Sequence, residues 1–401
     1  MKILQVNSVY RYGSTGKIMA DLHTGFLERG HESVVCYGRR RKPDEPHVYK
    51  VSSELEGKIH SVQSRLFGVE FAHSPVATSR LIARIKHEKP DVVHLHCLNG
   101  HFVNVYRLLT FLKKAGIPTV LTLHAEIMHT AGCDHAMDCE KWKTECHDCP
   151  RIRGKISHFF RDDARACYRK MRKAMEGFKD FTVVGVSEWL TERAKQSPIF
   201  QGCRFETVHN GIDTSVFTRH SADGLRRKLG IPEDKKIILH VTPSFYHPIK
   251  GGHYVLELAE KMPDAQFIIV GFNGDPSPLP PNVIAIAHTQ DQHELAEYYS
   301  MADCLICTSL RESFPTVCLE AVSCGCNVVG FHTGGVPDTI PEGMGTTVPC
   351  YDVDAFRQAV DNWSTVRVSE TRMREVNEAN SRERMVERYM DIYRVSVDRC
   401  R

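Results

Sequence analysis

The stretch Glu312-Ser-Phe-Pro-Thr-Val-Cys-Leu-Glu320, followed by Gly334-Gly-Val-Pro-Asp338, is the most informative part of this 401-residue chain. Two carboxylates eight positions apart are separated by a loop-like Ser-Phe-Pro and by the apolar start of a helix. One acid is therefore expected just before the helix and the other about a turn inside it. Because a helix N-terminus carries unpaired N–H groups and partial positive charge, a diphosphate is predicted to bind at Phe314, Pro315, Thr316 and Val317.

Short β-branched runs alternate with longer amphipathic stretches on both sides of this segment, which is typical of parallel sheets with crossover helices. Strands are predicted in the first half at 3–7, 33–37, 92–96, 119–124 and 182–186. The second half repeats the pattern at 236–241, 266–270, 283–287, 304–308 and 327–330. The predicted fold class is α/β, with two Rossmann-like domains and a cleft between them.

The composition is that of an ordinary soluble chain, with 42% hydrophobic residues, 25% charged residues and a net charge of +3. These values exclude a disordered or strongly basic protein. The N-terminal Met-Lys-Ile-Leu-Gln-Val-Asn is interpreted as a strand and not as a signal peptide, and no run approaches the roughly 18 apolar residues of a spanning helix. Fifteen cysteines scattered over both halves argue against a secreted disulfide framework. Cytoplasmic residence is expected.

The donor-site motif carries a resemblance to a known family. Asp303-Cys-Leu-Ile-Cys-Thr-Ser309, the segment 312–320, Ala321-Val-Ser-Cys-Gly325 and the Gly-Gly-Val-Pro turn resemble the donor site of family 4 retaining glycosyltransferases. The resemblance implies a GT-B fold, with a final helix that crosses back to the first domain. The expected domains are 1–208 (acceptor side, with a cysteine-rich insertion at 129–150), 209–378 (nucleotide-sugar donor domain) and 379–401 (C-terminal helix).

The resemblance also implies a function, namely a metal-independent hexosyltransferase that needs no cofactor for catalysis. Its donor would be a sugar linked to UDP or GDP, and its acceptor a glycan or lipid-linked glycan of surface polysaccharide, capsule, exopolysaccharide or lipopolysaccharide biosynthesis. Glu312 would position the sugar and stabilise developing positive charge, while Glu320 would bind the ribose hydroxyls. The Asp352-Val-Asp354 triplet is interpreted as a helix cap and not as a metal site.

Several other site residues are expected at the carboxyl ends of predicted strands. Gly13-Ser-Thr-Gly16 either lets a phosphate approach the backbone closely or forms only a tight strand-to-helix turn. Lys250 is expected to contact the donor diphosphate. The arginine that usually lies several residues upstream in the family is absent, which leaves its role to Ser244 or His247 or to no residue.

His124 is expected to contact the transferred sugar, because the family places a histidine at this position. The aspartate that usually follows the histidine is replaced here by Ala125. The partner that orients the imidazole ring is therefore missing, with Glu126 or His129 as substitutes. A purely structural histidine is the alternative.

A second local signal is the spacing Cys133-x5-Cys139-x6-Cys146-x2-Cys149, followed by Pro150. Four cysteines this close in a reducing compartment are a candidate structural zinc site, with free thiols or a redox pair as alternatives. Similar cysteine-bearing insertions occur in glycosyltransferases that resemble those of colanic-acid and capsule assembly. The insertion is expected to form a loop beside the cleft.

The segment 151–181 carries ten Lys or Arg residues against four acids, with Phe159-Phe160 among its apolar residues. It is either a solvated helix face or a contact with anionic lipid at the inner face of the plasma membrane. Two other functions stay open, a catalytically weakened nucleotide-sugar-binding protein and a GT-B nucleotide-sugar epimerase. A nucleic-acid partner is not expected, because the chain lacks a broad positive face.

Overall fold

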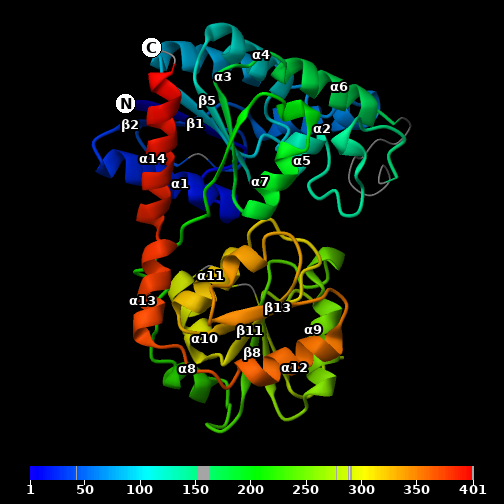
Figure 1. The fold of residues 1–401 in the computed structure, drawn as a ribbon, viewed down its shortest axis with the longest axis vertical. Helices are drawn as coiled ribbons and strands as arrows, with labels where there is room; N and C mark the ends of the chain where they lie inside the picture. The colour runs from blue at the N-terminus through cyan, green and yellow to red at the C-terminus, as the bar shows by residue number, and fades with distance from the viewer. Residues whose placement is uncertain (42, 151–161, 277, 288, 290, 400–401) are drawn as a thin grey trace. The chain divides into compact units, whose positions relative to one another are not determined.

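The computed structural model describes residues 1–41, 43–150, 162–276, 278–287, 289 and 291–399. The chain forms two compact units (Figure 1). Unit 1 comprises Met1–His209 and Met385–Arg401, and unit 2 comprises Asn210–Arg384. Part of the segment 151–181, for which either a solvated helix face or a lipid contact is expected, lies outside the described residues. Within the described ranges, no helix is long and apolar enough to cross a membrane.

Unit 1 is built on a seven-stranded sheet in the order β3-β2-β1-β4-β5-β6-β7, and all of its strand pairs are parallel. The strands are β1 (Lys2–Asn7), β2 (Glu32–Tyr37), β3 (Val48–Lys50), β4 (Val92–Leu95), β5 (Thr119–Leu123), β6 (Phe181–Gly185) and β7 (Arg204–Thr207). The central strands are buried along almost their whole length, as expected for a parallel sheet covered on both faces.

Eight helices among the described residues accompany this sheet. They are α1 (Gly13–Glu28), α2 (Glu54–Phe67), α3 (Pro75–Glu88), α4 (Val105–Ala115), α5 (Ile127–Thr130), α6 (Ala164–Met175), α7 (Glu188–Lys195) and α14 (Arg382–Asp398). The last helix, red in Figure 1, contributes Tyr389 and Tyr393 to the same buried cluster as Ile3 and Phe26. The C-terminal residues of the chain therefore complete the hydrophobic core of the N-terminal unit.

Unit 2 repeats the design with a six-stranded parallel sheet in the order β10-β9-β8-β11-β12-β13. Its strands are β8 (Ile237–Val241), β9 (Gln266–Val270), β10 (Val283–Ile286), β11 (Cys304–Cys307), β12 (Asn327–Phe331) and β13 (Gly345–Val348). Its helices are α8 (Asp223–Lys228), α9 (Gly252–Lys261), α10 (Gln292–Met301), α11 (Thr316–Ser323), α12 (Val353–Trp363) and α13 (Glu370–Ala379).

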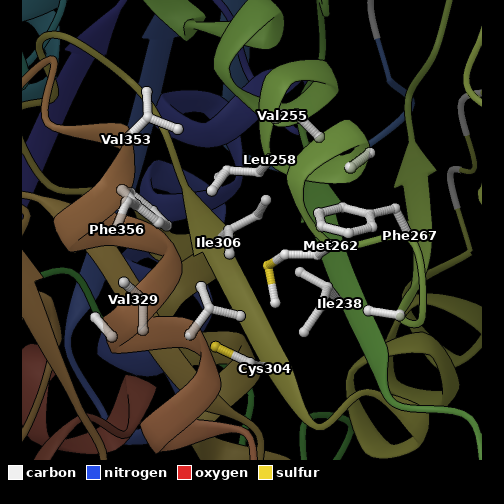
Figure 2. Close-up of a cluster of buried hydrophobic side chains, with 14 of the residues drawn as sticks. Ile238, Val255, Leu258, Met262, Phe267, Cys304, Ile306, Val329, Val353 and Phe356 are labelled. Atoms are coloured by element: carbon white, nitrogen blue, oxygen red, sulfur yellow. The ribbon is translucent and has the colours of Figure 1, made fainter.

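The core of unit 2 lies between the sheet and helices α9 and α12. Figure 2 shows Val255 and Leu258 of α9 and Phe356 of α12 directed toward Ile238 and Ile306 of the central strands. All five side chains are almost fully buried. This packing fixes the carboxyl ends of β8 and β11, from which the loops with the predicted donor-site residues emerge.

Candidate functional site

Lys250 and Glu312 meet in unit 2, although they are 62 positions apart in the sequence. Lys250 ends a short 3-10 turn after β8, and Glu312 follows β11. The Lys250 Nζ donates a hydrogen bond to Glu312 Oε1 at 2.6 Å. Burial lowers the pKa of Lys250, but the charge of Glu312 and this hydrogen bond outweigh burial and leave the pKa raised. Lys250 is therefore protonated at neutral pH.

Backbone contacts hold both loops in place. Leu310 N donates to Ile249 O at 2.7 Å, and the Thr308 hydroxyl donates to Lys250 O at 3.2 Å. The Gly-Gly turn after β12 supports Glu312 directly, since Gly335 N donates to Glu312 O at 2.9 Å. Gly334 has φ +55, and a Cβ there would collide with the same carbonyl oxygen. The Gly-Gly-Val-Pro motif thus fixes the backbone of the predicted catalytic carboxylate.

Helix α11 begins directly after Pro315, as predicted. Pro315 is its N-cap residue, and no side-chain hydrogen bond caps the helix. Phe314 and Pro315 are buried, whereas Thr316 and Val317 are half-buried at the first turn. The first turn therefore presents backbone N–H groups of the kind that bind phosphate oxygens.

Glu320 lies one turn inside α11, and Tyr299 of α10 donates its hydroxyl to Glu320 Oε2 at 2.9 Å. Burial raises the pKa of Tyr299 well above its ordinary value, so the tyrosine stays a donor. One carboxylate oxygen of Glu320 is thus held by the protein. Sequence reasoning did not identify Tyr299, because an aromatic residue in an amphipathic helix is usually a core residue.

The loop that lacks the family arginine is organised by its own residues. His247 Nδ1 accepts a hydrogen bond from Ile249 N at 3.3 Å, so this nitrogen stabilises the turn before Lys250. Ser244 is half-buried, and its backbone N–H donates to the Thr242 hydroxyl at 3.4 Å. His247 contacts Lys250 through the backbone, where Lys250 N donates to His247 O at 2.8 Å. Among the described hydrogen bonds, the side chain of neither predicted substitute is paired with the side chain of Lys250 or Glu312. The sequence prediction also did not include Arg311, a half-buried cation that directly precedes Glu312.

In unit 1, Gly13 and Gly16 lie in the first turn of α1, which begins at Gly13, and not in a turn that precedes the helix as expected. Gly13 has φ +63, and a Cβ at Gly16 would lie 3.2 Å from Arg11 N. The Arg11 N–H donates to Gly16 O at 2.9 Å, and the Asn7 amide donates to Thr15 O at 3.2 Å. Both glycines are thus needed by the backbone at the start of α1, while the capacity of this first helical turn to bind a phosphate stays a prediction.

His124 directly follows β5, and its hydrogen-bond partner is His96, which directly follows β4. The distance from His96 Nδ1 to His124 Nε2 is 3.2 Å. Burial lowers the pKa of His124 to about 4, so the ring is neutral at pH 7. In a pair of neutral imidazoles one nitrogen donates and the other accepts, so the pairing couples the tautomers of the two rings.

His96 is held in turn by buried neighbours. Its ring lies 3.9 Å from the ring of His94, measured between centroids. His94 Nδ1 is 2.6 Å from the Tyr393 hydroxyl of α14, and His94 Nε2 is 2.7 Å from the Thr122 hydroxyl. A buried polar network therefore connects the C-terminal helix to the predicted sugar-binding histidine.

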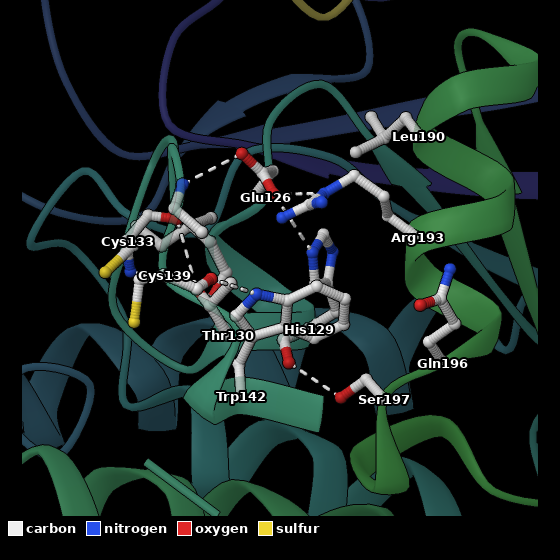
Figure 3. A network of polar contacts seen from close by, with 12 residues as sticks. Glu126, His129, Thr130, Cys133, Cys139, Trp142, Leu190, Arg193, Gln196 and Ser197 are labelled. Atoms are coloured by element: carbon white, nitrogen blue, oxygen red, sulfur yellow. Dashed lines mark hydrogen bonds and ion pairs between the residues drawn. The ribbon is translucent and has the colours of Figure 1, made fainter. Parts of the chain in front are cut away.

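The two residues expected to orient His124 belong to a different network, shown in Figure 3. Glu126 Oε1 accepts from Arg193 Nε of α7 at 2.7 Å and lies 3.6 Å from His129 Nε2, and its other oxygen accepts from Ala136 N at 2.8 Å. Burial opposes ionisation of Glu126, but His129 and Arg193 outweigh it and hold the pKa at about 2. The expectation that Glu126 or His129 orients His124 is therefore wrong.

The cysteine-rich insertion is anchored by a buried tryptophan. Trp142 donates its indole N–H to Cys139 O at 2.8 Å, and its ring centroid lies 4.8 Å from the Arg193 guanidinium carbon. The Thr130 hydroxyl accepts from Cys133 N at 2.9 Å. These contacts fix the first half of the insertion against α7, as Figure 3 shows.

The four cysteines of the insertion, Cys133, Cys139, Cys146 and Cys149, line one pocket. Burial, followed by the three neighbouring thiols, raises the pKa of Cys146 to about 12. Across the part of the chain that the structure describes, no group of three or more potential ligands is arranged to hold a metal ion. The four thiols are thus neighbours without forming a coordination shell.

Comparison with known sequences identifies the family. A model described as Glycosyltransferase Family 4 matches residues 15–216, half of the chain, and one described as Glycosyl transferases group 1 matches residues 221–382. The D-inositol 3-phosphate glycosyltransferase of Mycolicibacterium smegmatis is 31% identical over 171 residues, which are 39% of this chain and 39% of that protein. The enzyme of the same description from Mycobacterium bovis is 30% identical over 173 residues, 40% of this chain and 36% of that protein. The matched region is thus about two fifths of the length of these curated relatives.

Solved structures share the fold over nearly the whole chain. Sucrose-phosphate synthase from Thermosynechococcus elongatus superimposes with a TM-score of 0.68 at 17% identity, over 98% of both chains. Anabaena HepE, solved in complex with UDP-glucose, gives a TM-score of 0.60 at 16% identity, over 100% of this chain and 99% of that one. The predicted GT-B fold is confirmed. Because the Family 4 model extends over half of its residues, the chain belongs to glycosyltransferase family 4.

Proposed function

We propose that this protein is a retaining glycosyltransferase that moves a hexose-type sugar from a nucleoside-diphosphate sugar to a surface-polysaccharide intermediate carried on a lipid. The observation that carries the proposal is the ion pair between Lys250 and Glu312, with Nζ and Oε1 2.6 Å apart, directly before the first turn of α11. A cation, an anion and the backbone N–H groups at the start of a helix meet there, as a donor with both a diphosphate and sugar hydroxyls requires.

Each group has a role that fits its surroundings. Lys250 and the N-terminus of α11 bind the diphosphate, and Glu312 accepts hydrogen bonds from the sugar and stabilises its developing positive charge. Glu320 binds the ribose hydroxyls, and the hydrogen bond from Tyr299 positions its carboxylate for this contact. Gly16 lets the backbone approach the diphosphate, and His124 contacts the transferred sugar as a neutral ring.

The proposed step retains the configuration at the anomeric carbon. The bond from that carbon to the diphosphate oxygen breaks, and the acceptor hydroxyl oxygen forms a new bond on the same face of the sugar. The hydroxyl proton passes to the departing diphosphate oxygen, so Glu312 does not act as a covalent nucleophile. Lys250 offsets the negative charge that develops on the leaving group.

The transfer is proposed to be independent of metal ions, in line with the general behaviour of the two matched families. The Asp352-Val-Asp354 triplet supports this interpretation, because Asp352 is the N-cap of α12 and accepts from Ala355 N at 2.9 Å. Activity that is abolished by EDTA and restored by Mg²⁺ or Mn²⁺ would contradict the proposal.

The direct test is incubation of the protein with UDP-hexoses and GDP-hexoses in the presence of candidate acceptors. The acceptors should include lipid-linked saccharides and inositol phosphate, the compound in the names of the curated relatives. Release of the nucleoside diphosphate with formation of a glycoside of unchanged anomeric configuration, assigned by NMR, is the expected result. Conversion of the donor into an epimeric nucleotide sugar, in the absence of any acceptor, would instead identify a nucleotide-sugar epimerase.

A catalytically weakened nucleotide-sugar-binding protein is the second candidate function. It is favoured by the absence of an arginine between Val241 and Lys250 and by Ala125 after His124. This candidate predicts tight binding of a nucleoside diphosphate with no turnover on any acceptor. The intact Lys250–Glu312 pair favours the enzyme.

We also propose that Cys133, Cys139, Cys146 and Cys149 hold a structural zinc ion. Their spacing and their common pocket support this proposal. Because no group of described residues is arranged as a metal site, a zinc ion would have to draw the thiols together. Native mass spectrometry is expected to show one zinc per chain. A metal-free mass with all four thiols open to alkylation, or with a disulfide among them, would overturn this assignment.

A further inference from the structure

Helix α2 of unit 1 has its apolar residues on the side that faces away from the protein. Leu55, Ile59, Val62 and Leu66 follow one another at steps of four, three and four residues, which places them on a single helix face. Their exposed fractions are 66%, 48%, 52% and 56%, and Phe67 at the end of the helix is 72% exposed. We call this surface the α2 apolar stripe.

The opposite face of α2 is buried but is small and polar. It consists of Gly57, His60 and Ser64. His60 is bonded on both ring nitrogens, to the Ser74 hydroxyl and to Glu70 O, each at 2.7 Å. Hydrogen bonds therefore attach α2 to unit 1, and its apolar residues contribute little to the hydrophobic core. A helix with this distribution carries apolar side chains for a partner outside the fold.

The charges beside the α2 apolar stripe narrow the choice of partner. Both carboxylates of the helix are engaged, Glu54 with Arg39 and Lys50 and Glu56 with Arg80. The two cations, Lys58 and Arg65, are exposed and have no ion pair within the described part of the chain. On a helical wheel both lie on the same flank of the stripe. The unbalanced charge next to the apolar surface is therefore positive.

A second copy of this chain is a poor match for the stripe. A helix of 14 residues is about 21 Å long and roughly 10 Å wide, so its outward face offers roughly 200 Å². A stable protein interface needs about 800 Å² per partner. In an antiparallel pairing of two such helices, the flank with Lys58 and Arg65 would also meet its own copy, which is repulsive.

We propose that the α2 apolar stripe inserts into an anionic lipid surface, with Lys58 and Arg65 at the level of the headgroups. An amphipathic helix that lies in the plane of a membrane needs one apolar face and flanking cations, and α2 presents both. The inference rests on the proposed function only in its choice of a lipid partner. Vesicle binding without a donor sugar tests it separately from glycosyl transfer.

The test is co-sedimentation of the full-length protein with vesicles of phosphatidylglycerol and phosphatidylcholine in equal parts, and with vesicles of phosphatidylcholine alone. The variant Ile59→Ser/Leu66→Ser is expected to lower the partition coefficient on anionic vesicles at least tenfold. Lys58→Gln/Arg65→Gln is expected to lower it about fivefold per cation on anionic vesicles and to have no effect on neutral ones. All four side chains are exposed, so the thermal unfolding of both variants should match the wild type.

Leu27→Ser/Val395→Ser is the matched control, because Leu27 of α1 and Val395 of α14 are exposed apolar residues elsewhere in unit 1. This control should bind vesicles as the wild type does. Equal binding by the α2 variants and the control would overturn the proposal, as would a wild type that does not bind anionic vesicles. Light scattering that shows a dimer dissociated by Ile59→Ser/Leu66→Ser would assign the stripe to a second copy instead.

Discussion

At the scale of single residues, Glu312 has the most specific expected role. We expect Glu312→Ala to lower kcat by roughly 100-fold or more, because the sugar loses the carboxylate that stabilises its developing charge. Affinity for the nucleoside diphosphate should change little, since that ligand lacks the sugar. Initial rates and calorimetric titration measure the two effects. Glu342→Ala, at an exposed acid of the same unit, is the control. Equal losses in turnover and affinity would refute the role of Glu312.

His96 is expected to act as a positioning residue for His124, because the two rings are 3.2 Å apart and His96 is held by buried neighbours. His96→Phe should lower kcat about tenfold with little change in KM, and should change the tautomer of His124 in ¹⁵N NMR spectra. His87→Phe, at an exposed histidine of α3, should change neither. A His124 tautomer that is the same in the wild type and in His96→Phe would contradict this role.

Much of the donor side could be predicted residue by residue, because Lys250, Glu312 and Glu320 belong to motifs that are contiguous in the sequence. His96 and Tyr299 could not. His96 meets His124 only because β4 and β5 are neighbours in the sheet, and Tyr299 meets Glu320 only through the packing of α10 against α11. Spacing within one segment carries no information on such pairs.

At the scale of elements, the Glu126–Arg193 ion pair links the cysteine-rich insertion to α7, because the other oxygen of Glu126 accepts from Ala136 N of the insertion. We expect Arg193→Met to lower the free energy of unfolding by about 3 kcal/mol, because it leaves the buried Glu126 carboxylate without its cation. Urea unfolding followed by circular dichroism measures the change. Lys195→Met on the same helix, whose ion pair with Glu192 is exposed, should cost less than about 1 kcal/mol. If the two variants were equally stable, Arg193 would not be an anchor.

The elements themselves were largely predictable from sequence. All ten predicted strands are present, with ends within one residue, because buried parallel strands produce continuous apolar runs. The three strands that were not predicted, β3, β7 and β13, each lie at an edge of a sheet. Edge strands are short and partly exposed, as in the Arg-Phe-Glu-Thr of β7, so their sequences lack an apolar run. The outward apolar face of α2 was missed because an amphipathic pattern does not tell which face is buried.

At the scale of the whole molecule, buried histidines make stability depend on pH. Burial lowers the pKa of His23, His60, His124 and His240 to about 4, whereas a histidine in the unfolded chain titrates near 6.5. Between about pH 6.5 and 4 the unfolded chain therefore binds protons that the folded chain does not. The free energy of unfolding should fall over this window as the pH is lowered, by up to about 1.4 kcal/mol per pH unit for each histidine.

Calorimetric melting curves at pH 7 and pH 5 measure this effect. The melting temperature should be lower at pH 5, and the transition that contains unit 1 should shift further, because three of these four histidines lie in that unit. A melting temperature that is unchanged or higher at pH 5 would show that these histidines are protonated in the folded protein.

The central claim, a metal-independent site for a nucleoside diphosphate centred on Lys250, is tested most directly by calorimetric titration of the protein with UDP and with GDP in buffer that contains EDTA. We predict clear binding of one of the two, with affinity reduced about 10-fold or more by Lys250→Ala because a charge-assisted contact is lost. Lys261→Ala, at an exposed lysine of α9, should bind as the wild type does. Binding of neither nucleotide to the wild-type protein, or equal affinity in the wild type and Lys250→Ala, would contradict the account.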